Sequence, residues 1–222
     1  SASNFEGVCF EFEKNGTCTK GDKCKFSHDA SNTPDISSSH SSSSSASTST
    51  NTNGTTSTIE TLHSQYKALK KEGADKATIK EAKQRYKAAK AAKAFSRVTQ
   101  LNPNYPEGHN NLGSALQKLG RYEESLKCFR NALSLNPNYS DAYYNIGISC
   151  KELSKLDLAI ESFELALALN PTNWKAYGNI GLAFKDKSEW AEAVVAYGKA
   201  LEINSNDPEL VTNMGNAFKD QG

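Results

Sequence analysis

The feature that most constrains the fold of this chain is a repeat of 34 residues in its second half. Equivalent positions recur at this spacing as Leu112–Gly113, Ile146–Gly147, Ile180–Gly181 and Met214–Gly215, as Phe129, Phe163 and Tyr197, and as Ala132, Ala166 and Ala200. A fixed period of this length is typical of a solenoid, in which each unit packs only against its neighbours. The sequence therefore predicts a helical repeat array.

The pattern within each unit resembles the tetratricopeptide repeat (TPR). In that family, small residues let helix A approach helix B, an aromatic fills the gap, and proline ends helix B. Pro137 and Pro171 take the last place, and Ser205 replaces proline in the third unit. The turns between helices are marked by Gly120, Ser154 and Ser188. We expect full repeats at 106–139, 140–173 and 174–207, and a truncated helix A at 208–222.

The resemblance implies a mostly α fold without catalytic machinery, whose concave face binds extended peptides. Two rows of helix A residues are predicted to line that face: Asn111, Asn145, Asn179 and Asn213, and Lys151, Lys185 and Lys219. An Asn amide both donates and accepts, so the first row can hold a peptide backbone without reading its sequence. The lysines favour acidic segments. The alternative is that Asn is simply common at this position in such repeats.

Two other readings of the repeats stay open. The array resembles the TPR superhelix of O-GlcNAc transferase, so the chain could be the substrate-binding fragment of such an enzyme. Chaperone-binding repeats hold a carboxylate with a Lys and Asn set, which Asn145 and Lys175 fit. Other clamp positions are expected to differ, with Asn110, Ser114 and Asn179 standing there.

A second constraint lies near the N-terminus, where three cysteines and a histidine follow the pattern C-x8-C-x5-C-x3-H. These residues are Cys9, Cys18, Cys24 and His28. Three thiolates and one imidazole suit one tetrahedral Zn²⁺ in a closed, structural site. Zinc binding in such a finger contributes about 10–16 kcal/mol, which is then its folding free energy. The alternatives are four scattered residues without a common site, or a disulfide pair.

Residues 1–30 resemble a CCCH zinc finger, a family that mostly binds single-stranded RNA. The resemblance implies base stacking on Phe26 and contacts from Phe12, Lys20, Lys23 and Lys25. Lys20 stands where the family can carry a second aromatic, so generic single-strand contact is expected rather than recognition of AU-rich elements. Five acids outnumber the four lysines of the finger, which favours the competing use as a protein-contact module.

Residues 31–58 are almost entirely Ser, Thr, Asn and other small residues. Such a segment buries too little apolar surface to offset its ordering entropy, so we expect a disordered linker. It would let the finger and the helical region move independently while raising their effective concentration for a shared ligand.

A basic helical hairpin is predicted at 59–93, followed at 94–105 by the second half of a degenerate repeat. Residues 59–103 carry eleven Lys and Arg against four acids. The hairpin resembles a WHEP domain, a module of aminoacyl-tRNA synthetases, which implies tRNA binding. The alternative is a basic helical cap whose lysines only solvate its surface.

The remaining features bear on location and on catalysis. Cys128 and Cys150 fall on the repeats and are most simply buried or semi-buried thiols. Unpaired cysteines together with a metal thiolate site fit a reducing compartment, the cytoplasm or the nucleus. We find no signal peptide and no apolar run long enough to span a membrane. The chain begins at Ser1 and stops inside a repeat, so a fragment of a longer protein is expected. No acid–base pair, nucleophile or phosphate loop is recognised.

Together these patterns predict a non-enzymatic RNA-binding adaptor. Its finger would contact single-stranded RNA, with tRNA binding by the hairpin as a variant, and its solenoid would recruit a protein as an extended peptide. The rivals are a protein scaffold or co-chaperone without RNA binding, and the O-GlcNAc transferase-like fragment. The oligomeric state is not predicted.

Overall fold

The computed structural model describes residues 52–221, with side chains from Thr58 onward. That part of the chain forms nine helices and no strand. They are α2 (Thr52–Lys71), α3 (Lys76–Leu101), α4 (Pro106–Gln117), α5 (Tyr122–Leu135), α6 (Ser140–Glu152), α7 (Leu156–Leu169), α8 (Trp174–Asp186), α9 (Trp190–Ile203) and α10 (Pro208–Asp220). The predicted fold class, mostly α with a TPR solenoid, is confirmed. Across residues 52–221, no helix is both long and apolar enough to cross a membrane.

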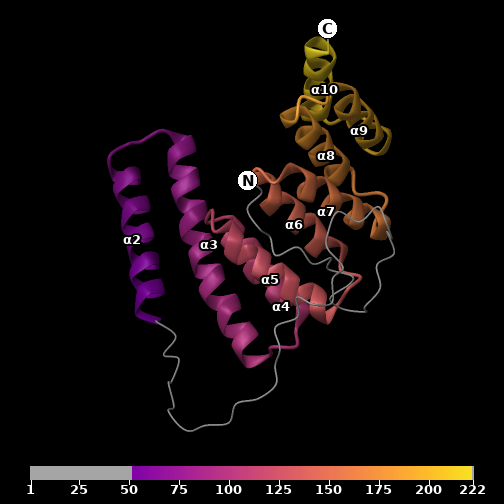
Figure 1. Ribbon diagram of the computed structural model, residues 1–222. Coiled ribbons are helices and arrows are strands. Elements are labelled where there is room, and N and C mark those ends of the chain that lie inside the picture. Colours follow the sequence, from indigo (N-terminus) through magenta and orange to yellow (C-terminus); the bar gives the residue numbers. More distant parts are fainter. Residues whose placement is uncertain (1–51, 222) are drawn as a thin grey trace, which may run out of the picture. The chain divides into compact units, whose positions relative to one another are not determined.

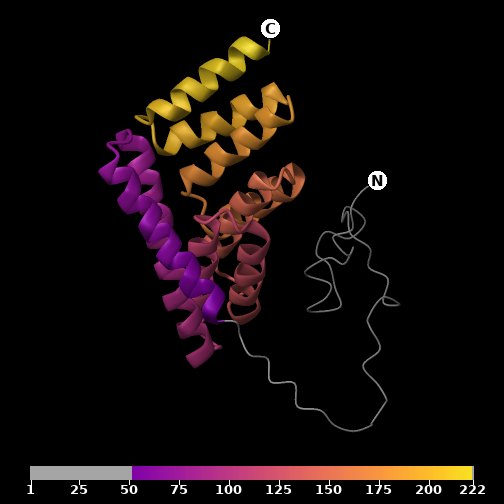
Figure 2. The ribbon, with the colours of Figure 1, turned by 90° about the vertical axis from the view of Figure 1, so that its left-hand side faces the viewer.

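The helices of the repeats stack in chain order (Figures 1 and 2). Each helix from α4 to α9 packs against the next, and the A helices α4, α6, α8 and α10 also touch one another in sequence. This pattern of neighbour-only contacts is that of a solenoid. The A helices therefore form one continuous row of side chains.

The hairpin α2–α3 differs from a regular repeat. Within the described part of the chain α2 contacts only α3, and it does not reach the first A helix, α4. The helix begins at Thr52, inside the range 31–58 that was predicted to be linker. Polar residues ahead of Ile59 continue its backbone hydrogen bonding without adding to the apolar pattern from which the helix start was predicted.

Helix α3 is one unbroken helix of 26 residues, so the predicted division at residue 93 falls in its interior. Asp75 caps its N-terminus, where Oδ1 accepts from the backbone N–H of Ala77 and Thr78 at 2.9 and 3.0 Å. The first half meets α2, as shown by the rings of Tyr86 and His63 with centroids 4.5 Å apart. The second half packs against α4, as shown by Gly108 of α4, where a Cβ would lie 3.3 Å from the side chain of Val98. The length of α3 thus lets it pack against both α2 and α4.

Three turns between an A and a B helix place one residue in the left-handed region. Gly120 has φ 74°, and the equivalent Ser154 and Ser188 have φ 57° and 60°. A left-handed conformation costs a residue with a Cβ roughly 1–2 kcal/mol, and glycine avoids that cost. The positions predicted as turns are therefore set by backbone geometry, and two of them carry strain.

The core of each repeat is an aromatic ring pressed against a glycine of helix A. Phe129, Phe163 and Tyr197 are fully buried. A Cβ built on the facing glycines Gly113, Gly147 and Gly181 would lie 2.5, 2.5 and 2.6 Å from those rings. Real Cβ atoms do not approach so closely, so only glycine allows this spacing of helix A and helix B.

This contact predicts opposite effects for two substitutions at the same register position. Gly147→Ala forces Phe163 out of place and should lower the free energy of unfolding by about 1–3 kcal/mol. Gly215→Ala in α10 is the control, because a Cβ there has nothing within 4 Å. It should raise stability by up to about 1 kcal/mol through helix propensity. Urea unfolding followed by circular dichroism measures both, and equal effects would contradict the role given to Phe163.

Candidate peptide-binding surface

The structure places only one of the predicted sets of site residues. The metal ligands Cys9, Cys18, Cys24 and His28 lie outside the described residues. So do the RNA-contact residues Phe12, Lys20, Lys23, Lys25 and Phe26. The two predicted rows of peptide-binding residues lie on α4, α6, α8 and α10, and their geometry can be followed in detail.

Asn145 uses its amide group to hold neighbouring repeats together. Its Nδ2 donates to Oδ1 of Asn110 at 3.0 Å and lies 3.4 Å from Oγ of Ser114. Asn110 is itself buried, at 6% exposure. A buried amide needs such a partner, since an unpaired one costs about 1–3 kcal/mol. The donor side of Asn145 is thus occupied within the protein, and its Oδ1 accepts no bond from residues 52–221.

Asn179 is engaged on both sides of its amide. Nδ2 donates to the hydroxyl oxygen of Tyr144 at 3.3 Å and to the backbone carbonyl of Lys175 at 2.9 Å. Oδ1 accepts from Nζ of Lys151 at 3.4 Å. The two predicted rows therefore meet here, and they bond to each other.

The outer members of the Asn row differ from the inner ones. Asn111 is exposed and Asn213 is half-buried. Neither makes a side-chain hydrogen bond within the described residues. The row is therefore not uniform: Asn145 and Asn179 brace the joints between repeats, whereas Asn111 and Asn213 keep free amides. Its peptide-binding role stays a prediction, and these two residues are its best carriers.

The Lys row also changes along the solenoid. The side chain of Lys151 is 19% exposed and lies 3.9 Å from a carboxylate oxygen of Glu152. Lys185 is half-buried and Lys219 is exposed. Positive charge free to meet a ligand thus lies on α8 and α10.

The first repeat carries Gln117 at the place of these lysines, 34 residues before Lys151. Its Nε2 donates to the backbone carbonyl of Asn145 at 2.7 Å and to Oγ of Ser149 at 2.8 Å. Ser149 in turn lies 2.8 Å from Oγ of the buried Ser125. This polar network was not predicted, although Gln117 stands at the register position of the lysines.

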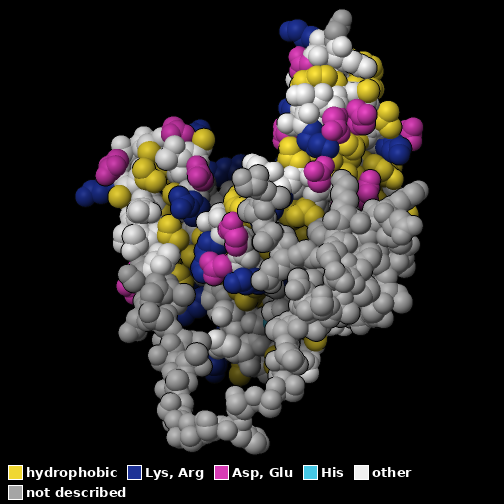
Figure 3. Space-filling model, in the orientation of Figure 1, with side chains coloured by type: hydrophobic (Ala, Val, Ile, Leu, Met, Phe, Trp, Pro, Cys, Tyr) yellow, Lys and Arg dark blue, Asp and Glu magenta, His cyan; other side chains and the backbone are white. Residues whose placement is uncertain are grey.

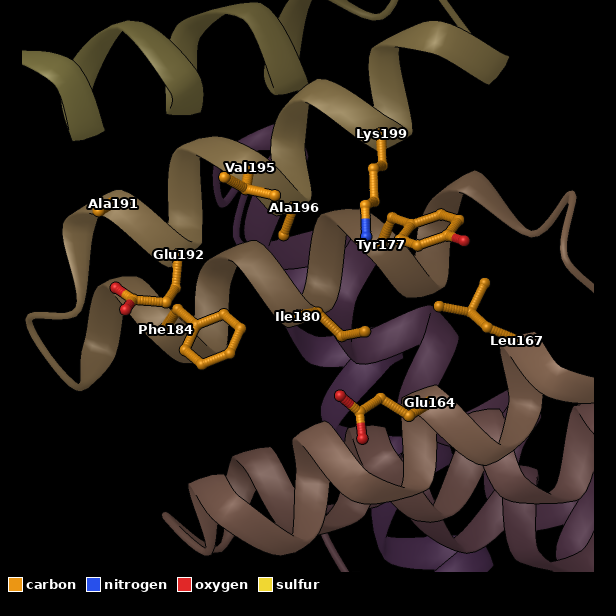
Figure 4. Close-up of a pocket in the computed structure, with 10 residues that line it drawn as sticks. All are labelled: Glu164, Leu167, Tyr177, Ile180, Phe184, Ala191, Glu192, Val195, Ala196 and Lys199. Atoms are coloured by element: carbon orange, nitrogen blue, oxygen red, sulfur yellow. The ribbon is translucent and has the colours of Figure 1, made fainter.

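A cleft of about 460 Å³ lies between α7, α8 and α9 and was also not predicted (Figure 4). Leu167, Tyr177 and Ile180 are among its apolar lining, and the charged side chains at it are those of Glu164, Glu192 and Lys199. The Lys199 ammonium sits 5.9 Å from the centre of the Tyr177 ring. The signal for it was in the repeat: Phe184 and Val195 replace Cys150 and Glu161 of the preceding unit.

The two thiols of the repeats are poorly suited to chemistry. Cys150 is buried and Cys128 is half-buried, and both are free. Burial raises the pKa of each thiol to about 11. At neutral pH both remain protonated, and the thiolate is the form that reacts and binds metal. No cluster of three metal-binding side chains occurs within residues 52–221.

Comparison with known families agrees with this architecture. The sequence model of the tetratricopeptide repeat matches residues 106–139 and 140–173, and a second TPR repeat model matches 80–120 and 181–222. The model of the zinc finger of C-x8-C-x5-C-x3-H type matches residues 5–30. The chain is a tetratricopeptide-repeat protein with a CCCH zinc finger. TPR repeats indicate a protein-interaction scaffold, a fold that is typically non-catalytic, and the finger suggests nucleic-acid binding.

Among solved structures, MamA shares 25% identity with the chain, with a TM-score of 0.58 over 64% of this chain and 84% of MamA. The first TPR of Spaghetti (RPAP3) bound to an HSP90 peptide is 24% identical, with a TM-score of 0.50 over 51% of this chain and 90% of that one. The first TPR domain of human RPAP3 gives 24% and 0.52 over 54% and 94%. These likenesses establish the fold. No curated protein sequence matches the chain.

The hydrogen bonds of Asn179 predict that it serves stability while its register equivalent Asn213 does not. Asn179→Ala should lower the free energy of unfolding by about 1 kcal/mol relative to Asn213→Ala, because the control shares the gain in helix propensity but loses no bond. Thermal unfolding of both variants measures the difference. Equal stabilities would show that the bonds to Tyr144 and Lys151 contribute nothing.

Proposed function

We propose that this protein is a non-enzymatic adaptor that holds RNA with its zinc finger and a protein segment with its TPR solenoid. The observation that carries the proposal is the joining, in one chain, of a finger from a nucleic-acid-binding family and a solenoid from a protein-binding one. Both kinds of module act by binding, so the proposed activity is linkage. The free thiols of the repeats favour the cytoplasm or the nucleus.

The finger is proposed to hold one Zn²⁺ through Cys9, Cys18, Cys24 and His28. Three thiolates and a neutral imidazole satisfy a tetrahedral ion and leave no open position for a substrate. When bound, the metal supplies structure, because the segment has few apolar side chains of its own. Its role is to present the surrounding side chains in a fixed arrangement.

RNA contact is assigned to the aromatic and basic residues that flank the ligands. Phe26 and Phe12 offer π-faces on which unstacked bases can lie, and Lys20, Lys23 and Lys25 can meet phosphates. The acids of the finger offset these lysines, so a single finger binds weakly. Further modules on the same chain then raise the overall affinity through their effective concentration.

The solenoid is proposed to bind an extended, acidic protein segment. The free amides of Asn111 and Asn213 pair with a peptide backbone, and Lys185 and Lys219 favour carboxylates. The structural neighbour RPAP3 holds the HSP90 peptide SRMEEVD, which is rich in acids. That likeness supports the class of ligand, and it makes a co-chaperone role the second candidate.

Removal of zinc provides the test of the finger. We expect chelation to expose the three thiols of the finger, which then react at once with a disulfide reagent at neutral pH. Cys128 and Cys150 should not add to this fast reaction, because burial raises the pKa of both thiols. Cys24→Ser should lose the metal and weaken binding of a labelled single-stranded RNA pool at least tenfold. Unchanged RNA affinity in this variant would remove the finger from the RNA site.

Binding of the peptide SRMEEVD, followed by fluorescence anisotropy, tests the solenoid. Lys185→Ala combined with Lys219→Ala should weaken it about tenfold. Lys118→Ala combined with Lys127→Ala is the control of equal charge, and it should leave the affinity unchanged. Equal losses in the two double variants would indicate a diffuse charge effect and no groove.

A further inference from the structure

A single row of lysines runs along one face of α3. Lys76, Lys80, Lys83, Lys87 and Lys90 follow each other at intervals of four, three, four and three residues. With 3.6 residues per turn, these intervals keep all five within a sector about 80° wide, and the row extends for about 21 Å. All five are exposed.

Few acidic residues lie near this row: Asp75 stands at its N-terminal end as the helix cap, where its carboxylate accepts hydrogen bonds from the backbone of Ala77 and Thr78. Glu81 is the only acid of α3, and five residues of helix place it about 140° from Lys76. It faces a shallow groove between α2 and α3, together with Glu72. Within residues 52–221 no ion pair is found for Lys76, Lys80, Lys83 or Lys87, and Lys90 lies 5.7 Å from the ring of Tyr86. Among the residues that the structure describes, the lysines of the row are therefore not paired with carboxylates.

The row is also not needed for packing. The buried residues of α3 are Ala88, Ala89 and Ala92, and no lysine is among them. Figure 3 shows Lys and Arg side chains on the hairpin, with Asp and Glu side chains among them on the face in view. The packing of α3 against α4 uses apolar side chains, so the fold of the TPR array does not depend on the lysine row.

From this arrangement we infer that the lysine row of α3 is a second RNA site, which binds the phosphate backbone without regard to base sequence. The inference rests on the proposed function, from which it takes RNA as the ligand, but the residues that it uses lie outside the finger. Lysine ammoniums are point charges that pair with phosphates. The nearest aromatic ring, that of Tyr86, is occupied by His63 and Lys90 and offers no stacking face.

A polyanion fits the row better than a membrane or an acidic peptide does. Membrane-surface helices need an apolar face to insert. Helix α3 packs against α2 and α4, and its one exposed large apolar side chain is that of Leu101 at its C-terminal end. An acidic peptide would be held best where lysines alternate with groups that grip its backbone, as along the A helices. Positive charges at regular intervals along a helix can pair with successive phosphates of RNA, which carries one charge on every nucleotide.

The finger and the row would lie on the same chain, separated by the segment between them. Two weak sites that engage one RNA act with an effective concentration set by that segment, so joint affinity exceeds either alone. The lysine row would thus supply the positive charge for phosphate binding that the finger, with its near-neutral net charge, does not have.

The test removes charge from the row in the full-length chain. The variant carries Lys80→Gln, Lys83→Gln and Lys87→Gln, which preserve helix propensity. The control carries Lys118→Gln, Lys127→Gln and Lys199→Gln, with the same change in net charge. Both are made with and without Cys24→Ser, and binding of a 20-nucleotide single strand and of a stem-loop RNA is titrated against salt.

Each lysine that meets a phosphate of a single strand contributes about 0.7 to the slope of log K against log salt. The row variant should therefore lose about 2 from that slope, equally for different base sequences, and the control should lose none. In the Cys24→Ser background RNA binding should persist and then disappear with the row variant. The two RNA probes show whether the row prefers single or paired strands.

Equal slopes in the row variant and the control would overturn the inference. So would displacement of the RNA by a glutamate-rich peptide at equal charge, or binding of phosphatidylserine vesicles that the row variant abolishes while RNA binding is unaffected. The outcome for the finger is independent. If Cys24→Ser leaves RNA affinity unchanged while the row variant removes it, the proposed role of the finger fails and the row remains.

Discussion

The solenoid depends on one contact, the aromatic ring of helix B held against a glycine of helix A. Because Phe163 approaches the Gly147 backbone so closely, the two helices can neither separate without a cavity nor accept a side chain between them. The same contact recurs at Phe129 and Tyr197, so each unit repeats the geometry of the last. A Cβ built at the equivalent Gly215 of α10 would have nothing within 4 Å among the residues that the structure describes.

Polar bonds between repeats then fix how the A helices lie side by side. Asn145 reaches back to Asn110, and Asn179 reaches back to Tyr144, in each case across 35 residues. Two of the four asparagines that the sequence predicts to bind a ligand, Asn145 and Asn179, thus stabilise the contacts between repeats instead. The residues left for the proposed peptide contact are Asn111, Asn213, Lys185 and Lys219, a narrower set than the periodicity alone suggests.

The sequence predicted those features that rest on local geometry or strict repetition. The 34-residue period located the helices, the buried rings and the turns at Gly120 and Ser154, because each follows from spacing along the chain. It did not predict the start of α2 at Thr52, since no apolar residue marks it. It also missed the bonds of Gln117 and the cleft beside Tyr177, which arise from side chains that meet only after neighbouring units have stacked.

In the proposed function, the N-terminal part and the basic hairpin hold RNA while the repeats hold protein. Photo-crosslinking of the intact, zinc-loaded chain to a 4-thiouridine-containing RNA, read by mass spectrometry of the attached peptides, tests it most directly. We expect attachment within residues 5–30 and along α3, with none on α4 to α10. Crosslinks spread over the A helices, or confined to them, would contradict it.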